Sequence, residues 1–166
     1  VEMIADAIDG KGVINIVEGQ LGSPSSEYGV TGIEKGLENY PEITIGTSQA
    51  GDWDRGKAMN IAEDWLSSNM EFDAIIALND EMAIPVANVL KSAGKSIPVV
   101  GIDCQDETAE FIKQGVLYGS IYKNPMYEGV SSAALAIAAA CEMEIEESYY
   151  VPYTKVTAEN ADNYKS

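Results

Sequence analysis

The stretch AIIALNDEMAIPVANVL at residues 74–90 holds the pattern that decides the fold. Its first five residues are a short apolar run, which is typical of a strand buried on both faces of a sheet. A polar turn follows at Asn79 and Asp80, and apolar residues then recur at helical spacing as far as Leu90, with Asp80 placed as an N-cap. The stretch predicts a strand, a tight turn and an amphipathic helix in direct succession.

The same unit recurs along the chain. Short β-branched runs, each expected to be a strand buried on both faces, stand at Val13–Val17, Ile43–Gly46, Ala74–Leu78, Val99–Ile102 and Ser120–Tyr122. The helices between them have as start signals Ser25 or Ser26, Asp54, Asp80 and Asp106. Gly94 and Gly115 stand where C-cap glycines do. The alternation predicts the α/β class: an open, mostly parallel sheet with right-handed connections and helices on both faces.

Composition limits the partners. The chain has 166 residues, of which 46% are hydrophobic and 22% charged, enough for one domain with a real core. With 27 acidic and 10 basic residues the formal charge is −17, which would repel nucleic acid and anionic lipid surfaces. The longest apolar run, Val130–Cys141, is too short for a membrane helix.

The residues for common enzyme chemistry are missing. The chain has no histidine, which removes the usual general base and disfavours acyl transfer. Cys104 and Cys141 form no paired spacing, so we read both as small buried residues and expect no metal site and no disulfide framework. No dinucleotide-binding or P-loop motif follows a strand, and abundant carboxylates are not a positioned glycosidase pair. We expect a protein that is not an enzyme and holds no cofactor.

Polar and aromatic residues stand at the predicted carboxyl ends of the strands, where open α/β sheets bind ligands. Trp53, Asn79, Asp103 and Lys123 occupy equivalent positions after successive strands, and the loop at residues 22–27 adds Ser25 and Glu27. An indole can stack on the apolar face of a sugar ring, while carboxylate and amide groups bind its hydroxyls. The set predicts a site for a polyol.

Each of these residues also has a structural interpretation. Trp53 could cover a turn, Asp103 could cap the helix that starts near residue 106, and Asn79 could be a turn or cap residue. Lys123 could be a solvated strand end, and Glu27 could complement a helix dipole.

Five collinear stretches resemble the type I periplasmic sugar-binding proteins of the ribose and galactose class. They are GDWDRGKAMNIAEDWL (Gly51–Leu66), AIIALNDEMA (Ala74–Ala83), GKSIPVVGID (Gly94–Asp103), IKQGVLYGSIYKNP (Ile112–Pro125) and VTAEN (Val156–Asn160). The resemblance implies that Trp53 stacks on the sugar, that Asn79 and Asp103 bind hydroxyls, and that Lys123 reaches the ligand.

Two positions depart from that family's pattern. In GSPSSEYGVTG, at residues 22–32, Glu27 or Gly29 stands where the family presents an arginine that clamps the sugar. The residue before Asn124 is Lys123, where the family has glutamine or asparagine. The resemblance therefore implies a sugar or polyol, and does not specify ribose or glucose.

The resemblance also implies a two-lobed protein. Residues 1–123 would form the C-terminal ligand-binding lobe, and residues 124–166 would supply a crossover helix (Pro125–Met143) and a strand (Tyr149–Val156) to an N-terminal lobe that is missing here. We expect that lobe, with a signal or lipid anchor, upstream of Val1. Without it, the apolar helix face would pack on its own sheet edge, be disordered, or form a homodimer through residues 125–143, which we favour.

We expect the solute-binding component of an ABC transporter, exported as a periplasmic or cell-surface lipoprotein. It would capture a sugar or polyol by closing two lobes on it and deliver it to a membrane permease. The alternative is the ligand-sensing domain of a lac-type repressor, or a sugar-sensing receptor component. The strong negative charge favours the exported form.

Overall fold

A computed structural model describes residues 1–164 of the chain, in which six strands form one sheet with the order β2-β1-β3-β4-β5-β6. The strands are β1 (Lys11–Glu18), β2 (Glu42–Ala50), β3 (Ala74–Ala77), β4 (Val99–Asp103), β5 (Gly119–Tyr122) and β6 (Thr154–Thr157). The first five strands are parallel to one another, and β6 is antiparallel to β5. The predicted open, mostly parallel sheet is confirmed.

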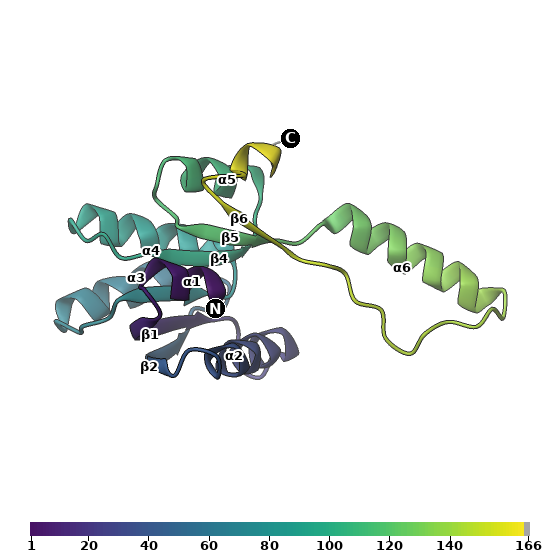
Figure 1. Cartoon of the computed structure of the whole chain (residues 1–166), viewed down its shortest axis with the longest axis horizontal. Coiled ribbons are helices and arrows are strands. Elements are labelled where there is room, and N and C mark those ends of the chain that lie inside the picture. Colours follow the sequence, from purple (N-terminus) through teal and green to yellow (C-terminus); the bar gives the residue numbers. More distant parts are fainter. Residues whose placement is uncertain (165–166) are drawn as a thin grey trace.

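Helices connect the parallel strands and cover both faces of the sheet (Figure 1). They are α1 (Glu2–Ala7), α2 (Pro24–Leu37), α3 (Arg55–Ser67), α4 (Asp80–Ser92), α5 (Asp106–Lys113) and α6 (Pro125–Ala140), with a short 3-10 helix η1 (Ala161–Tyr164). From β1 the chain crosses to β2 on one side, and from β2 it returns past β1 toward β3, β4 and β5 on the other. Right-handed crossovers in opposite directions place α2 on one face and α3, α4 and α5 on the other.

The core forms on both faces of the central strands. Ile14 and Ile16 of β1 are fully buried on one face of the sheet, and Ile75 of β3 is fully buried on the other. Trp65 of α3 and Met82 of α4 are also fully buried and belong to the same core cluster. Burial at this level is worth about 1.5–3 kcal/mol for each large apolar side chain.

Strand β2 differs from the prediction, because it is not buried on both faces. Ile43 is its one buried residue, and Ile45 is exposed. The reason is its place at the edge of the sheet, where it has β1 as its single neighbour.

Helix starts agree with the sequence in part. Asp54 caps α3 by accepting a hydrogen bond from the Lys57 amide at 2.8 Å, as predicted. Ser23, and not Ser25 or Ser26, caps α2, because Pro24 occupies the first helical position and keeps the preceding residue extended.

Two further starts are shifted by one residue. Asn79 caps α4 where Asp80 was predicted, and α5 begins at Asp106 after Gln105. The glycines expected after helix ends are confirmed, since Gly94 and Gly115 have φ of +72° and +63°.

Helix α6 extends away from the rest of the molecule (Figure 1). Its N-cap is Asn124, whose Oδ1 accepts a hydrogen bond from the Tyr127 amide at 2.9 Å, and none of the residues of α6 is buried. Val130 and Ile137 are 64% and 65% exposed. The option that α6 packs on the edge of its own sheet is therefore wrong, and Cys141 just beyond α6 is exposed, not buried as predicted.

The last strand corrects the expected division of the chain. We predicted that a strand around Tyr149–Val156 joins the sheet of another lobe, but β6 starts at Thr154 and pairs with β5, with Val156 opposite Ser120 and buried. Residues 154–157 thus return to this sheet, and η1 packs beside α5. The boundary at residues 123 and 124 otherwise stays a prediction.

Within residues 1–164, no helix has the length and apolar character to cross a membrane.

Candidate ligand-binding site

The carboxyl ends of β1 to β5 lie at one edge of the sheet because these strands are parallel. The chain leaves β1 toward β2 on one side, whereas β3 lies on its other side, so the topological switch point is between β1 and β3. Ligands of open α/β sheets bind at such a point, outside the carboxyl ends. Trp53, Asn79 and Lys123 follow strands at this edge, and Asp103 is the last residue of β4.

Trp53 lies over the end of β1. Its indole occupies the space in which Gly19 would carry a side chain, since a Cβ there would be 1.8 Å from Trp53 Cζ2. Both Asp52 and Trp53 have a positive φ, of +53° and +63°, which few non-glycine residues adopt. The turn is fixed by the Gly51 amide bonded to Glu18 O at 2.9 Å and by Asp54 as cap. The half-buried indole thus packs on Gly19, a contact that was not predicted from the sequence.

Asp103 and Lys123 are in contact, with Lys123 Nζ 3.4 Å from Asp103 Oδ1. Burial raises the pKa of Asp103, and the charge of Lys123 opposes that shift. Together with Tyr122 and Asn124 they line an open cavity of about 950 Å³. The cap of α5 is Gln105, so the alternative in which Asp103 caps this helix is wrong.

The backbone at Asp103 is unusual. Its φ is +116° and that of Cys104 is +52°, so the ends of β2 and β4 both carry two successive non-glycine residues with positive φ. Such residues cost about 1–3 kcal/mol each and cluster at ligand sites. Neither pair could be recognised from the sequence, because no glycine marks it.

Asp80, which we predicted to cap a helix, is instead a buried carboxylate beneath the turn at Asp103. It is 3% exposed; its Oδ2 accepts from the Cys104 amide at 2.6 Å and its Oδ1 from the Ser120 hydroxyl at 2.7 Å. Burial raises the pKa of Asp80 to about 6, against the opposing effect of these hydrogen bonds and one from Thr108.

Asn79 has a structural role with one of its two polar atoms. Its Oδ1 accepts from the Met82 amide at 3.0 Å, so the cap interpretation is confirmed for the oxygen. Among residues 1–164 the side-chain amide nitrogen has no hydrogen-bond partner, which leaves its two donors for a ligand or another group.

Ser25 and Glu27 lie in the exposed first turn of α2, at the same edge of the sheet. Within residues 1–164 neither forms a hydrogen bond to the other four predicted residues. Gly29 packs against Leu78, where a Cβ would come within 2.9 Å of that side chain. A long side chain at position 29 would therefore have to displace Leu78.

Arg55 joins three helix starts along this edge, an arrangement not predicted from the sequence. It forms ion pairs with Glu81 of α4 and, at 2.7 Å, with Glu107 of α5. Nearby, Lys57 Nζ lies 2.6 Å from Asp52 in the Trp53 turn. These half-exposed pairs tie together the turns that carry the candidate residues, although surface pairs contribute little stability each.

The edge therefore combines an aromatic face, a carboxylate beside an ammonium group and a side-chain amide donor. Asp103 and Lys123 are brought into contact, and Trp53 and Asn79 lie on neighbouring loops without a hydrogen bond to that pair in the described part of the chain. This arrangement suits neutral hydroxyl-rich ligands. Among residues 1–164, no three His, Cys, Asp or Glu side chains are grouped to hold a metal ion.

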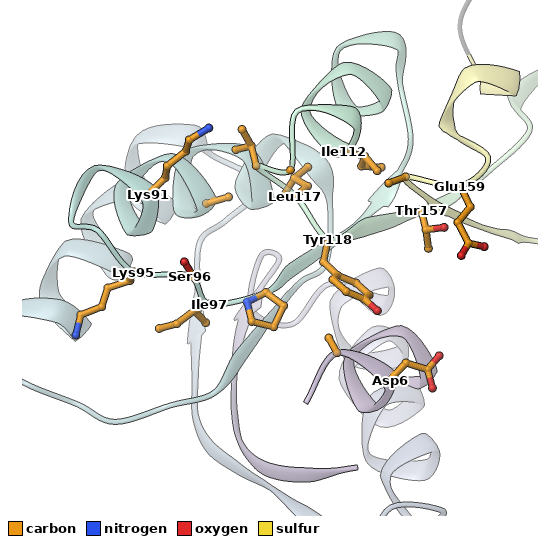
Figure 2. Close-up of a pocket in the computed structure, with 16 residues that line it drawn as sticks. Asp6, Lys91, Lys95, Ser96, Ile97, Ile112, Leu117, Tyr118, Thr157 and Glu159 are labelled. Atoms are coloured by element: carbon orange, nitrogen blue, oxygen red, sulfur yellow. The ribbon is translucent and has the colours of Figure 1, made fainter. Parts of the chain in front are cut away.

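A second cavity, of about 790 Å³, lies at the opposite end of the strands (Figure 2). Its walls come from the segments before β4 and β5, with Ile97, Leu117 and Tyr118 around it and Lys91 and Lys95 at its rim. None of the six predicted site residues lines it.

The chain is similar to known proteins along most of its length. Residues 1–143 match the family described as periplasmic binding protein domain. A xylitol-binding protein of Mycolicibacterium smegmatis is 32% identical over 97% of this chain and 47% of its own length. A putative rhizopine-binding protein of Rhizobium meliloti is 30% identical over 98% and 54%. The chain thus spans about half the length of these curated relatives.

Solved structures of ABC-transporter solute-binding proteins have the same fold. One from Actinobacillus succinogenes with bound D-allose has a TM-score of 0.90 and 31% identity over 98% of this chain and 58% of its own. One from Bacillus halodurans with bound myo-inositol has a TM-score of 0.89 and 30% identity over 99% and 57%. The fold is thus one lobe of the type I periplasmic-binding-protein fold, and the homodimer through residues 125–143 finds no support in these relatives.

The resemblance inferred from the five collinear stretches is confirmed by the family match over residues 1–143. The solved relatives described above are solute-binding proteins of ABC transporters. This chain belongs to the periplasmic binding protein domain family, with the sugar-binding proteins of ABC transporters as its relatives.

Proposed function

We propose that this chain is the ligand-binding lobe of an exported solute-binding protein that captures a sugar or related polyol for an ABC transporter. The observation that carries the proposal is the pair of left-handed turns at the ends of β2 and β4, which present Trp53 and Asp103 at the switch-point edge of the sheet. Relatives that bind xylitol, D-allose and myo-inositol support the ligand class.

Binding in this proposal uses both halves of a longer protein. The indole supplies a flat apolar surface, Asp103 accepts from hydroxyl groups, and Lys123 and the Asn79 amide donate. Contacts to a second lobe would close the protein over the ligand, and the closed form would be the one presented to the permease. The apolar side chains of α6 would pack against that second lobe. The whole protein would be periplasmic or a lipoprotein at the cell surface.

The lac-type repressor alternative has less support. The relatives described above are binding proteins named for their ligands, and the charge of −17 opposes a role beside DNA. We therefore keep transport as the proposed function.

Calorimetry on the intact protein tests the proposal, with xylitol, D-allose and myo-inositol as titrants. We expect binding of at least one of them, and compaction of the protein in small-angle scattering when that ligand is added. The Asp103→Asn variant should lose at least about tenfold in affinity, because a carboxylate accepts hydrogen bonds about twice as strongly as a neutral group. Its melting temperature without ligand should stay close to that of the unsubstituted protein. No binding of any polyol or sugar by the intact protein would refute the proposed function.

A further inference from the structure

We propose that Asp80 is a positioning residue for ligand binding, whose carboxylate holds the turn at Asp103 and Cys104 so that Asp103 faces the ligand cavity. The inference rests on the proposed function, since Asp103 is a candidate ligand contact there. Asp80 itself does not line the cavity beside Asp103 and Lys123. It would therefore act through its neighbour and not by touching the ligand.

The contacts of Asp80 join three elements at one point. Asp80 belongs to the first turn of α4, and it accepts from the Cys104 amide at 2.6 Å, after β4, and from the Ser120 hydroxyl at 2.7 Å, in β5. Thr108 of α5 bonds to it as well. The two carboxylate oxygens have separate donors, so the bond to the turn uses Oδ2 and the bond to β5 uses Oδ1.

The turn that Asp80 contacts is one that needs to be held. Asp103 and Cys104 both carry a Cβ, and their φ values of +116° and +52° lie in the region that favours glycine. The bond from Asp80 reaches the amide of Cys104, which is the peptide group between these two residues. Losing it would let this peptide relax and turn the Asp103 side chain away from Lys123.

A glycine leaves room for this carboxylate, although burying the charge lowers stability. A Cβ on Gly101 would lie 2.0 Å from Asp80 Oδ1, so the glycine in β4 opens the space. Burial raises the pKa of Asp80, and the negative charge of Asp103 adds to that shift. An ionised group at this depth costs stability, and its hydrogen bond to the strained turn accounts for its presence.

Three variants of the intact protein separate positioning from general stability. Asp80→Ala removes the acceptor. Asp80→Asn keeps an acceptor for the Cys104 amide, since the Ser120 hydroxyl can accept from the new amide group. Ser120→Ala removes another partner of the same carboxylate and leaves the Cys104 bond in place, which makes it the matched control.

The readout is the affinity for whichever of xylitol, D-allose and myo-inositol binds the unsubstituted protein most tightly. We expect Asp80→Ala to weaken binding by at least about tenfold, Asp80→Asn by less than about threefold, and Ser120→Ala by less than about twofold even if its melting temperature falls. The proposal is wrong if Asp80→Ala binds normally, or if Asp80→Ala and Ser120→Ala lose affinity alike, in step with their melting temperatures. If Asp80→Ala does not fold, Gly101→Ala replaces it, because its methyl group displaces the carboxylate, and the same loss is expected.

A second readout needs no ligand and separates this inference from the proposed function. If none of the three compounds binds the unsubstituted protein, the proposed function fails, but labelling of Cys104 by a thiol reagent still tests the turn. Cys104 is 2% exposed, and the exposed Cys141 serves as the internal reference in mass spectrometry. Asp80→Ala should speed the labelling of Cys104 by at least about tenfold relative to Ser120→Ala, because a released turn opens the thiol to solvent. Equal rates in the two variants would show that Asp80 does not hold the turn.

Discussion

At the scale of single residues, Trp53 is the side chain whose surroundings fit ligand stacking best. Its ring rests on Gly19 and remains half-exposed at the switch-point edge. We expect Trp53→Ala to reduce ligand affinity in the intact protein by about 2–4 kcal/mol, the range of a lost aromatic anchor. Calorimetry measures this loss, and Trp53→Phe, which keeps an aromatic face, should recover part of it. Unchanged affinity in Trp53→Ala would remove this residue from the site.

Asp80 makes a second prediction at this scale, concerning pH. Because burial raises its pKa to about 6, the folded protein holds a proton on Asp80 that the unfolded chain releases above about pH 4. The stabilisation that this bound proton gives to the folded protein is complete below about pH 4 and is lost as the pH rises through about 6. Asp80→Asn does not titrate, so between about pH 4 and 7 it should gain roughly 3 kcal/mol relative to the unsubstituted protein.

Urea denaturation of both proteins at the two pH values measures this difference. The other carboxylates titrate in both proteins and cancel in the comparison. A difference that does not change with pH would mean that Asp80 has the same pKa in the folded and unfolded chain.

At the scale of elements, α6 is a helix of which no residue is buried within residues 1–164. Ile137 is 65% exposed, so Ile137→Gln in the isolated chain should change the free energy of unfolding by no more than about 0.5 kcal/mol. In the intact protein, where we propose that a second lobe covers α6, the same substitution should cost more than about 1 kcal/mol. Tyr28→Gln on α2, at a residue 78% exposed, is the control and should have a small effect in both proteins. Equal small effects at Ile137 in both would show that α6 stays uncovered.

At the scale of the whole molecule, the exposed face of α6 and the tyrosines after it give the isolated chain an apolar surface. Val130, Ile137, Met143 and Tyr150 are all at least 63% exposed, and contiguous patches of this kind drive association. Light scattering of residues 1–166 should therefore show a mass that rises with concentration, whereas the intact protein stays monomeric. Replacing Val130 and Ile137 together by lysine should suppress the rise. A strictly monomeric isolated chain would count against an apolar interface on α6.

The sequence by itself determined the α/β class, five strand positions and the family, because short apolar runs, helix caps and turn glycines are local signals that neighbouring residues carry. It also placed Trp53, Asn79, Asp103 and Lys123 at strand ends, since parallel strands bring their carboxyl ends to one edge. Tertiary structure alone decided the roles of Gly19, Asp80 and Gly101. Gly19 contacts Trp53, Asp80 bonds to Cys104 and Ser120, and Gly101 leaves space for Asp80. These partners are between 21 and 40 positions apart in the sequence. It likewise decided that β6 pairs with β5 and that β2 is an exposed edge. Which strands become neighbours depends on how the whole sheet packs, and no local pattern encodes that choice.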